Sequence, residues 1–249
     1  MILWLASLAW AGETLPQPVV TEAGAALELD WTRMVLRATA SAGTHGTEST
    51  RAVEELARRS LQVGMEQGVA RIPVTSSVGF EALLGGPLGD ALRSRMHRWE
   101  VTEAVYHASG RVELTAELSL QDLLKPWTLG RVGEPAETRA TPITGLVVDA
   151  RGSGAVPAWS PALLDADGAV LYDGWLWEEE AVTRAPVVYV ADPAHPAAAR
   201  AGERPLFLRA REARGPDLLL DAEEAARFRA EAQGARVLGE GTVVVVIDP

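Results

Sequence analysis

Histidine is the side chain best suited to proton transfer and metal binding near neutral pH, and this chain has four of them. They are His45, His97, His107 and His195, and no two have the H-x-H or H-x-x-x-H spacing of a metal pair. His97 and His107 mark the two ends of one expected strand, about 33 Å apart by strand rise, so they cannot share a metal ion. The chain has no cysteine, so thiolate ligands are excluded as well. We therefore expect no metal site and no cofactor.

The sequence lacks the signatures of nucleophilic hydrolases. There is no G-x-S-x-G motif, and the single lysine, Lys125, has Asp122 rather than a serine three residues before it. A Walker loop is excluded because it also needs a lysine after its glycines. The acidic runs Glu54-Glu55, 178–180 and Glu223-Glu224 are typical of solvated helix faces and helix starts. One hypothesis that stays open is a hydrolase that uses two converging carboxylates.

Two loops have partial binding motifs. Arg151-Gly152-Ser153-Gly154 follows an expected strand, but it lacks the third glycine and the helix of a dinucleotide fingerprint, so we interpret it as a tight connecting loop. Asp165-x-Asp167-Gly168 begins like a calcium loop, but the third acidic position and the final glutamate are missing. A hairpin turn accounts for both aspartates and the glycine.

The remaining candidates for ligand contact are Trp175 and Trp177. Two residues apart, they would project to the same side of a strand and could stack on a sugar or on another protein. Packing in the core is the alternative interpretation. The sequence therefore contains no catalytic constellation, and we expect a protein that is not an enzyme.

Composition excludes further classes of function. The 249 residues have 23 basic and 34 acidic side chains, a net charge of −11, which leaves no basic patch for nucleic acid. With 47% apolar residues, the chain can bury the core of one large domain or two small ones. The absence of cysteine also excludes disulfides and the lipobox cysteine of a bacterial lipoprotein.

The first eleven residues, MILWLASLAWA, are uncharged and end in an A-x-A pattern. This predicts the apolar part and cleavage site of a secretory signal peptide, with cleavage before Gly12; a short buried strand is the alternative. Residues 12–26 are interpreted as a leader without periodicity. No later stretch is long enough and free enough of charge to cross a bilayer, so we expect no transmembrane span in the mature chain.

Residues 27–125 are predicted to form an α+β domain of β-α-β-α-β-β order, with its helices on one face of a sheet. The expected order is a long strand, a helix, a short strand, a helix split by a glycine-rich stretch, and a hairpin. The hairpin turns at Ser109-Gly110, and pairing Ala108 with Arg111 places Val105 opposite Leu114. The corresponding ranges are 27–40, 48–67, 71–76, 80–96 and 99–120.

Residues 126–142, rich in proline and glycine, are predicted to be a linker to a second domain over 143–249. That domain is expected to be a mixed α/β sandwich, so the fold class is mixed α/β with two small domains. Its expected strands are 144–150, the two arms of a hairpin over 162–172, 187–190, 205–210 and a central buried strand over 242–248. Helical segments are expected over 178–184 and 195–201, with a third capped by Asp221 and running to Gln233.

The second half resembles a known family. The run Thr144-Gly-Leu-Val-Val-Asp-Ala-Arg-Gly152, followed by Pro157-Ala-x-Ser-Pro161 and Leu164-Asp-x-Asp-Gly-x-x-Leu-Tyr172, is similar to exported bacterial proteins of the LPP-twenty lipoprotein family and to relatives of flagellar assembly protein T. The similarity spans most of residues 29–248 and is most specific over 144–172. Ser153 and Trp159 depart from it, because more aliphatic residues are expected there, and the segment 175–190 matches poorly.

The resemblance implies a non-catalytic envelope protein with a structural or assembly role, in the periplasm or at the outer-membrane periphery. The implied partners are envelope or flagellar proteins, and a homo-oligomer is also compatible. No binding residue is carried over from the family. A periplasmic glycan- or peptide-binding module, using Trp175 and Trp177 or an exposed hairpin edge, is the second hypothesis.

Overall fold

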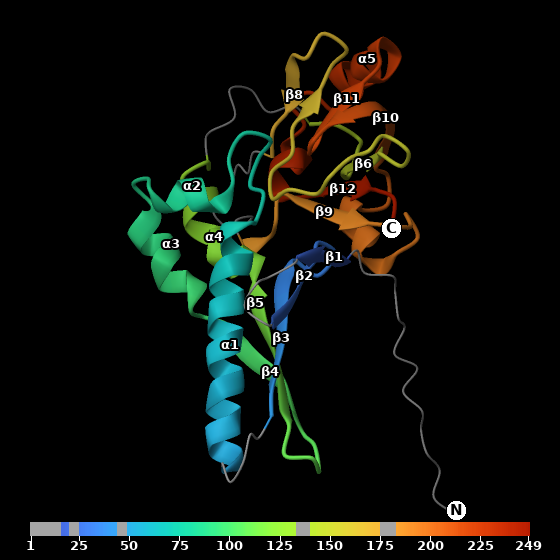
Figure 1. The fold of residues 1–249 in the computed structure, drawn as a ribbon. Helices are drawn as coiled ribbons and strands as arrows, with labels where there is room; N and C mark the ends of the chain where they lie inside the picture. The colour runs from blue at the N-terminus through green and yellow to red at the C-terminus, as the bar shows by residue number, and fades with distance from the viewer. Residues whose placement is uncertain (1–15, 20–24, 44–48, 133–139, 175–182) are drawn as a thin grey trace, which may run out of the picture.

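The computed structural model describes residues 16–19, 25–43, 49–132, 140–174 and 183–249. Figure 1 shows two β-sheets with helices around them, one built from the N-terminal half of the chain and one from the C-terminal half. The fold is therefore mixed α/β with two sheets, as the sequence predicts. The predicted signal peptide, residues 1–11, lies outside the described residues.

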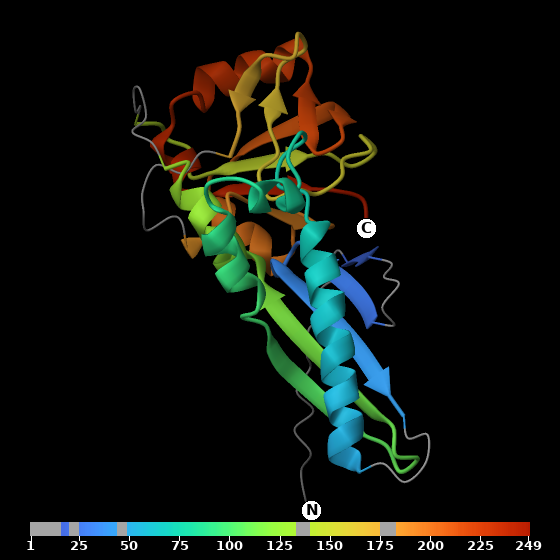
Figure 2. The same ribbon diagram turned by 60° about the vertical axis from the view of Figure 1, so that its left-hand side comes forward.

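The N-terminal sheet is antiparallel throughout, with the strand order β1-β2-β3-β5-β4 in the described part of the chain. A long helix, α1, lies along one face of this sheet and packs on β2, β3 and β5 (Figure 2). Shorter helices follow at the end of the sheet nearer the C-terminal half. The elements are β1 (Pro16–Val19), β2 (Ala25–Asp30), β3 (Val35–Ala42), α1 (Thr50–Ala70), α2 (Phe80–Leu84), α3 (Gly89–Met96), β4 (Glu100–Tyr106), β5 (Val112–Ser119) and α4 (Leu120–Leu129).

Helix α1 begins where Ser49 caps it, its hydroxyl accepting a hydrogen bond from the Ala52 amide at 3.3 Å. The predicted apolar stripe is confirmed, except that Leu56 is 41% exposed. Two glycines on the buried side bring the helix close to the sheet. A Cβ built on Gly64 would lie 2.7 Å from the Cβ of Ala25, and Gly68 is similarly close to Leu27.

The prediction of a single strand over 27–40 is wrong, because the chain turns back within it. Asp30 Oδ1 accepts hydrogen bonds from the amides of Thr32, at 3.0 Å, and Arg33, at 2.8 Å, which stabilises a turn between β2 and β3. Met34 completes the turn at φ 57°, in the left-handed region. The turn also shifts the alternation of buried residues. The buried apolar residues have odd numbers in β2 and even numbers in β3, so that Leu29 and Leu36 both face the core.

Other local predictions in this half need correction. The leader over 12–26 includes β1, and β2 starts within it. The expected strand over 71–76 has only an isolated bridge between Pro73 and Gly79. The predicted linker over 126–142 contains the end of α4, where Trp127 and Thr128 are buried. The split of the 80–96 helix into two is confirmed.

The 99–120 hairpin forms, but its predicted register is wrong by one residue. Ala104, not Val105, lies opposite Leu114. The reason is a three-residue loop, in which the His107 amide donates to the Arg111 carbonyl at 2.8 Å and Gly110 has φ 81°. The expected apolar face is buried on β5 only, because β4 is almost wholly exposed.

The C-terminal sheet has the order β8-β7-β11-β10-β6-β12-β9 among the described residues. Its centre is parallel: β6 pairs with β10 and β12, and β12 pairs with β9. Strand β12 is buried between two neighbours, as the β-branched run predicts. The elements are β6 (Leu146–Asp149), β7 (Leu163–Leu164), β8 (Val170–Tyr172), β9 (Val187–Val190), η2 (Pro196–Ala201), β10 (Leu206–Arg214), β11 (Asp217–Leu220), α5 (Ala222–Glu231), η3 (Arg236–Glu240) and β12 (Val243–Val246).

Most predicted elements of this half are present. The 162–172 hairpin, the 187–190 strand, the 195–201 helical turn and the helix capped by Asp221 are confirmed. Strand β10 is longer than expected, and it turns into β11, which the sequence reading missed. The predicted helix over 178–184 lies almost entirely outside the described residues.

The two halves meet at Tyr189, whose side chain is buried. Its hydroxyl donates to the carbonyl of Ala158, at 2.9 Å, and accepts from the amide of the same residue, at 3.1 Å. Its ring meets Trp31 of the N-terminal half edge to face, with the ring centroids 5.9 Å apart. Its main-chain oxygen accepts from the Thr32 hydroxyl at 2.8 Å. Burial raises the pKa of the Tyr189 hydroxyl, which therefore stays protonated.

Main-chain contacts extend this junction. The amides of Trp159 and Ser160 donate to the carbonyls of Pro73, at 3.0 Å, and Val74, at 2.8 Å. The indole of Trp159 donates to the Thr128 hydroxyl at 3.2 Å. The residues after α1 and at the end of α4 thus receive their hydrogen bonds from the C-terminal half.

Replacing Gly64 with alanine tests the close approach of α1 to β2. Alanine favours a helix by about 1 kcal/mol over glycine, but overpacking against Ala25 costs about 1–3 kcal/mol. We expect the free energy of unfolding of Gly64→Ala, measured in urea, to fall by about 1 kcal/mol. Adding Ala25→Gly should recover part of the loss, beyond the sum of the single effects. A Gly64→Ala protein more stable than wild type would contradict this packing.

Tyr189→Phe tests the junction. The substitution leaves the buried amide and carbonyl of Ala158 without a partner, so we expect the free energy of unfolding to fall by about 1–3 kcal/mol. The matched control is Tyr106→Phe, which removes an exposed hydroxyl and should change it by less than about 0.5 kcal/mol. Equal effects in the two variants would contradict the role of the Tyr189 hydroxyl.

Candidate functional site

The face of the N-terminal sheet opposite α1 forms an open polar concavity with a volume of about 680 Å³. Strand alternation explains its polarity, because apolar side chains of β2, β3 and β5 turn toward α1 and the residues between them turn outward. Four strands and one turn supply the lining, which consists of Glu28, Arg33, Arg37, Thr39, Thr102, Glu103, Thr115 and Glu117.

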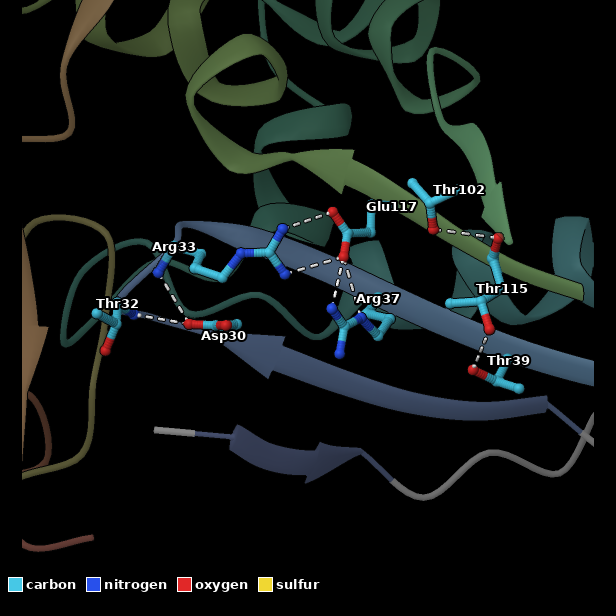
Figure 3. Close-up of polar contacts among 8 residues, drawn as sticks. All are labelled: Asp30, Thr32, Arg33, Arg37, Thr39, Thr102, Thr115 and Glu117. Atoms are coloured by element: carbon cyan, nitrogen blue, oxygen red, sulfur yellow. Dashed lines mark hydrogen bonds and ion pairs between the residues drawn. The ribbon is translucent and has the colours of Figure 1, made fainter. Parts of the chain in front are cut away.

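Strand register brings these side chains into rows. Arg37 lies directly opposite Glu28 on one side and Glu117 on the other. In the next row, Thr39 lies opposite Thr115, and their hydroxyl oxygens are 3.1 Å apart (Figure 3). Directly opposite residues on one face are close enough to interact, so each row is a line of polar contacts across the sheet.

Glu117 is held by two arginines, as Figure 3 shows. Arg33 donates to both carboxylate oxygens, at 2.9 and 3.0 Å, and Arg37 donates twice to Oε1, at 2.8 and 3.0 Å. These bonds, first those from Arg33, lower the pKa of Glu117, although partial burial opposes them. Glu117 therefore stays ionised at neutral pH, with both oxygens engaged, which suits it to hold position rather than to transfer a proton.

The turn between β2 and β3 positions Arg33. Asp30 is buried and fixes the turn through the two amide hydrogen bonds described above. Thr32, in the same turn, bonds to the main chain of Tyr189. The short segment that holds Asp30, Thr32 and Arg33, drawn in Figure 3, thus connects the concavity to the junction between the halves.

The residues predicted as candidates do not gather at this site. Trp175 and Trp177 lie outside the described residues, as does His45. His107 belongs to the β4–β5 turn and His195 caps η2, accepting from the Ala197 amide at 3.1 Å. Within the described ranges, no group of three histidine, aspartate or glutamate side chains is placed to hold a metal ion.

The two partial motifs are structural loops. The 151–154 segment is a connecting loop whose two glycines have positive φ, and the Gly152 amide donates to Asp248 Oδ2 at 2.8 Å. Asp165 shapes the β7–β8 turn by accepting from the amides of Asp167, at 3.0 Å, and Ala169, at 2.8 Å. Its other oxygen accepts from Arg229. Both predictions of a turn or loop are confirmed.

Sequence reasoning missed the polar concavity. It gave Glu117 the wrong cross-strand neighbour, because the predicted hairpin register is off by one residue. It also treated Arg33 and Arg37 as part of one strand rather than of a turn and a strand. The available signal was the Asp30-x-Thr32 turn chemistry before a second alternating run.

The fold and the site define the class of protein. It is a mixed α/β protein with two sheets, and on the open polar face of its N-terminal sheet arginine and glutamate side chains pair with each other. A family described as Treponema pallidum Tp0624, second domain, matches residues 145–249. The match covers the C-terminal sheet and its connections. No curated protein matches the chain.

Glu117→Gln tests the ionic cluster. The lowered pKa means that the carboxylate stabilises the fold fully above its unfolded pKa of about 4.3, and this stabilisation is lost as the pH falls through the lower folded value. We expect the variant to lose about 1 kcal/mol of unfolding free energy at pH 7, because the arginines are partly exposed. Urea titrations should show the difference shrinking below about pH 4.

The control for this prediction is Glu55→Gln, which removes an exposed carboxylate paired with Arg51 on α1. It should change the unfolding free energy by less than about 0.5 kcal/mol. A Glu117→Gln loss that is constant from pH 7 to pH 3 would show that the charge of Glu117 is irrelevant.

Proposed function

We propose that this protein is a non-catalytic, exported component of a bacterial cell envelope, with a structural or assembly role at the outer membrane or at a surface machine such as the flagellum. The proposal assigns residues 1–11 to export and the two sheets to a binding scaffold. It includes no cofactor and no reaction.

One observation carries the proposal: four carboxylates of the two sheets and their turns are already engaged in ion pairs or main-chain hydrogen bonds. Glu117 is bonded to two arginines, Asp165 and Asp30 to main-chain amides, and Asp149 to Arg151 at 2.7 and 2.9 Å. The Arg151 hydrogen bonds lower the pKa of Asp149, and the main-chain bond from Ala169 does so for Asp165. The lowered pKa values keep Glu117, Asp149 and Asp165 ionised, which suits them to maintain shape, whereas a catalytic acid or base needs a pKa near the working pH.

The resemblance of residues 144–172 to LPP-twenty and flagellar assembly T proteins supports an envelope role by analogy. The match of residues 145–249 to the second domain of Tp0624 is compatible with a module used in bacterial proteins. None of the helices in the described ranges is long and apolar enough to cross a membrane.

A binding module for a glycan or a peptide is the second candidate. The exposed strand β4 favours a peptide over a glycan, because its backbone can pair with an extended chain. Trp175 and Trp177 would be the contacts of a glycan site, and a binding signal lost in the Trp175→Ala, Trp177→Ala double variant would favour that alternative.

Fractionation of the native host, followed by crosslinking of the tagged full chain, tests the proposed function. We expect recovery with the outer membrane or flagellar basal bodies, in crosslinks to envelope proteins. Leu5→Arg interrupts the apolar segment and should leave the protein in the cytoplasm. The control Leu56→Arg makes the same change at an exposed site and should be exported. Wild-type protein in the cytoplasm, or as a free monomer without crosslinks, would overturn the proposal.

A further inference from the structure

Strand β4 is an uncovered edge of the N-terminal sheet. It is the last strand in the order β1-β2-β3-β5-β4, and six of its seven residues are exposed. Helix α1 packs on β2, β3 and β5, so β4 lies at the margin of its cover (Figures 1 and 2). The contact with α1 in this region is polar: the Tyr106 hydroxyl donates to Glu54 at 3.0 Å. Such an edge offers backbone groups to another extended chain.

The hairpin turn determines which backbone groups face outward. The His107 amide donates to Arg111, so His107 points toward β5. Because the ladder alternates, Val105 and Glu103 also point toward β5, while the N–H and C=O groups of Ala104 and Tyr106 point to the open edge. The side chain of Thr102, at the bulge between Val101 and Glu103, donates to Thr115.

The two faces of β4 differ in chemistry. Glu100 and Glu103 lie opposite Glu117 and Thr115, on the polar face of the sheet. Val101, Ala104 and Tyr106 lie opposite buried positions of β5, on the α1 side. Val105, opposite Glu113, also lies on the polar face, so a strand added to β4 would meet the two carboxylates and one valine on that face and mainly apolar groups on the other.

Charge decides between a second copy and a different partner. Antiparallel pairing of two β4 strands would bring Glu100 and Glu103 of both copies onto one face, and like charges close together are destabilising. Glu117 is already neutralised by Arg33 and Arg37, whereas no cation among the described side chains pairs with Glu100 or Glu103. The chain is acidic overall, and the carboxylates of Glu100 and Glu103 make the β4 edge complementary to basic side chains.

We propose that β4 is the docking edge for an extended segment of a partner protein with alternating basic and apolar residues, which adds as a strand. The proposal rests on the assembly function above and specifies its partner chemistry. Main-chain hydrogen bonds from Ala104 and Tyr106 hold the segment, and Glu100 and Glu103 select its basic face.

The test is fluorescence anisotropy with a labelled peptide of roughly nine alternating valine and arginine residues, long enough to span the edge. Ala104→Pro removes an outward N–H and keeps the bonds to β5, a position where a proline is tolerated. We expect Ala104→Pro and Glu100→Lys/Glu103→Lys each to weaken binding at least tenfold. Hydrogen exchange should slow at Ala104 and Tyr106 when the peptide binds.

Controls separate strand addition from general charge attraction. Glu203→Lys changes an exposed acid elsewhere and should change the affinity less than twofold, and a scrambled peptide of the same composition should bind at least tenfold more weakly. Equal binding of the scrambled peptide, or unchanged affinity in Ala104→Pro, would overturn the proposal. Dimerisation of the wild type that Ala104→Pro abolishes would overturn it in favour of a second copy. Envelope recovery with no peptide binding would refute the edge and leave the assembly function standing.

Discussion

Burial of Tyr189 leaves its hydroxyl no water, so both its donor and its acceptor must be met within the protein. Ala158 meets them with its carbonyl and its amide, which fixes the loop before β7. The same tyrosine contacts Trp31 and accepts from Thr32, both in the turn between β2 and β3. The arrangement of each half at this junction therefore depends on the other.

The turn between β2 and β3 connects the junction between the halves to the open polar face. Its geometry is set by the buried Asp30, and it points Arg33 toward Glu117 on the open face while Thr32 points toward the C-terminal half. A shift of this turn would disturb the ionic cluster and the junction together. A structural protein that binds a partner on its N-terminal sheet would thus have that sheet oriented by its C-terminal half.

Charged side chains have different roles on the open face and at the β4 edge of the N-terminal sheet. The net charge is −11, yet the arginines of the open face are used within the protein to hold Glu117. Glu100 and Glu103 at the β4 edge are exposed, and we propose that they oppose pairing between copies and select a basic segment. One sheet thus combines an open face whose arginines pair with Glu117 and the edge that we propose as a docking site.

The sequence by itself determined the structural features that depend on residues close together along the chain. The apolar stripe of α1, the Asp221 cap, the turns at Asp165 and Gly110, and the buried run of β12 all depend on residues within one or two turns of each other. The two-sheet α/β class followed from these signals.

Only the tertiary structure decided how these elements meet. The pairing of Arg33 with Glu117 and the bond from Thr32 to Tyr189 join residues 84 and 157 positions apart in the chain. The sequence pattern alternates in the same way for either register. Burial against α1 and the Tyr189 junction fix where the N-terminal sheet and its β2–β3 turn lie, and these are interactions across the fold that no local pattern contains.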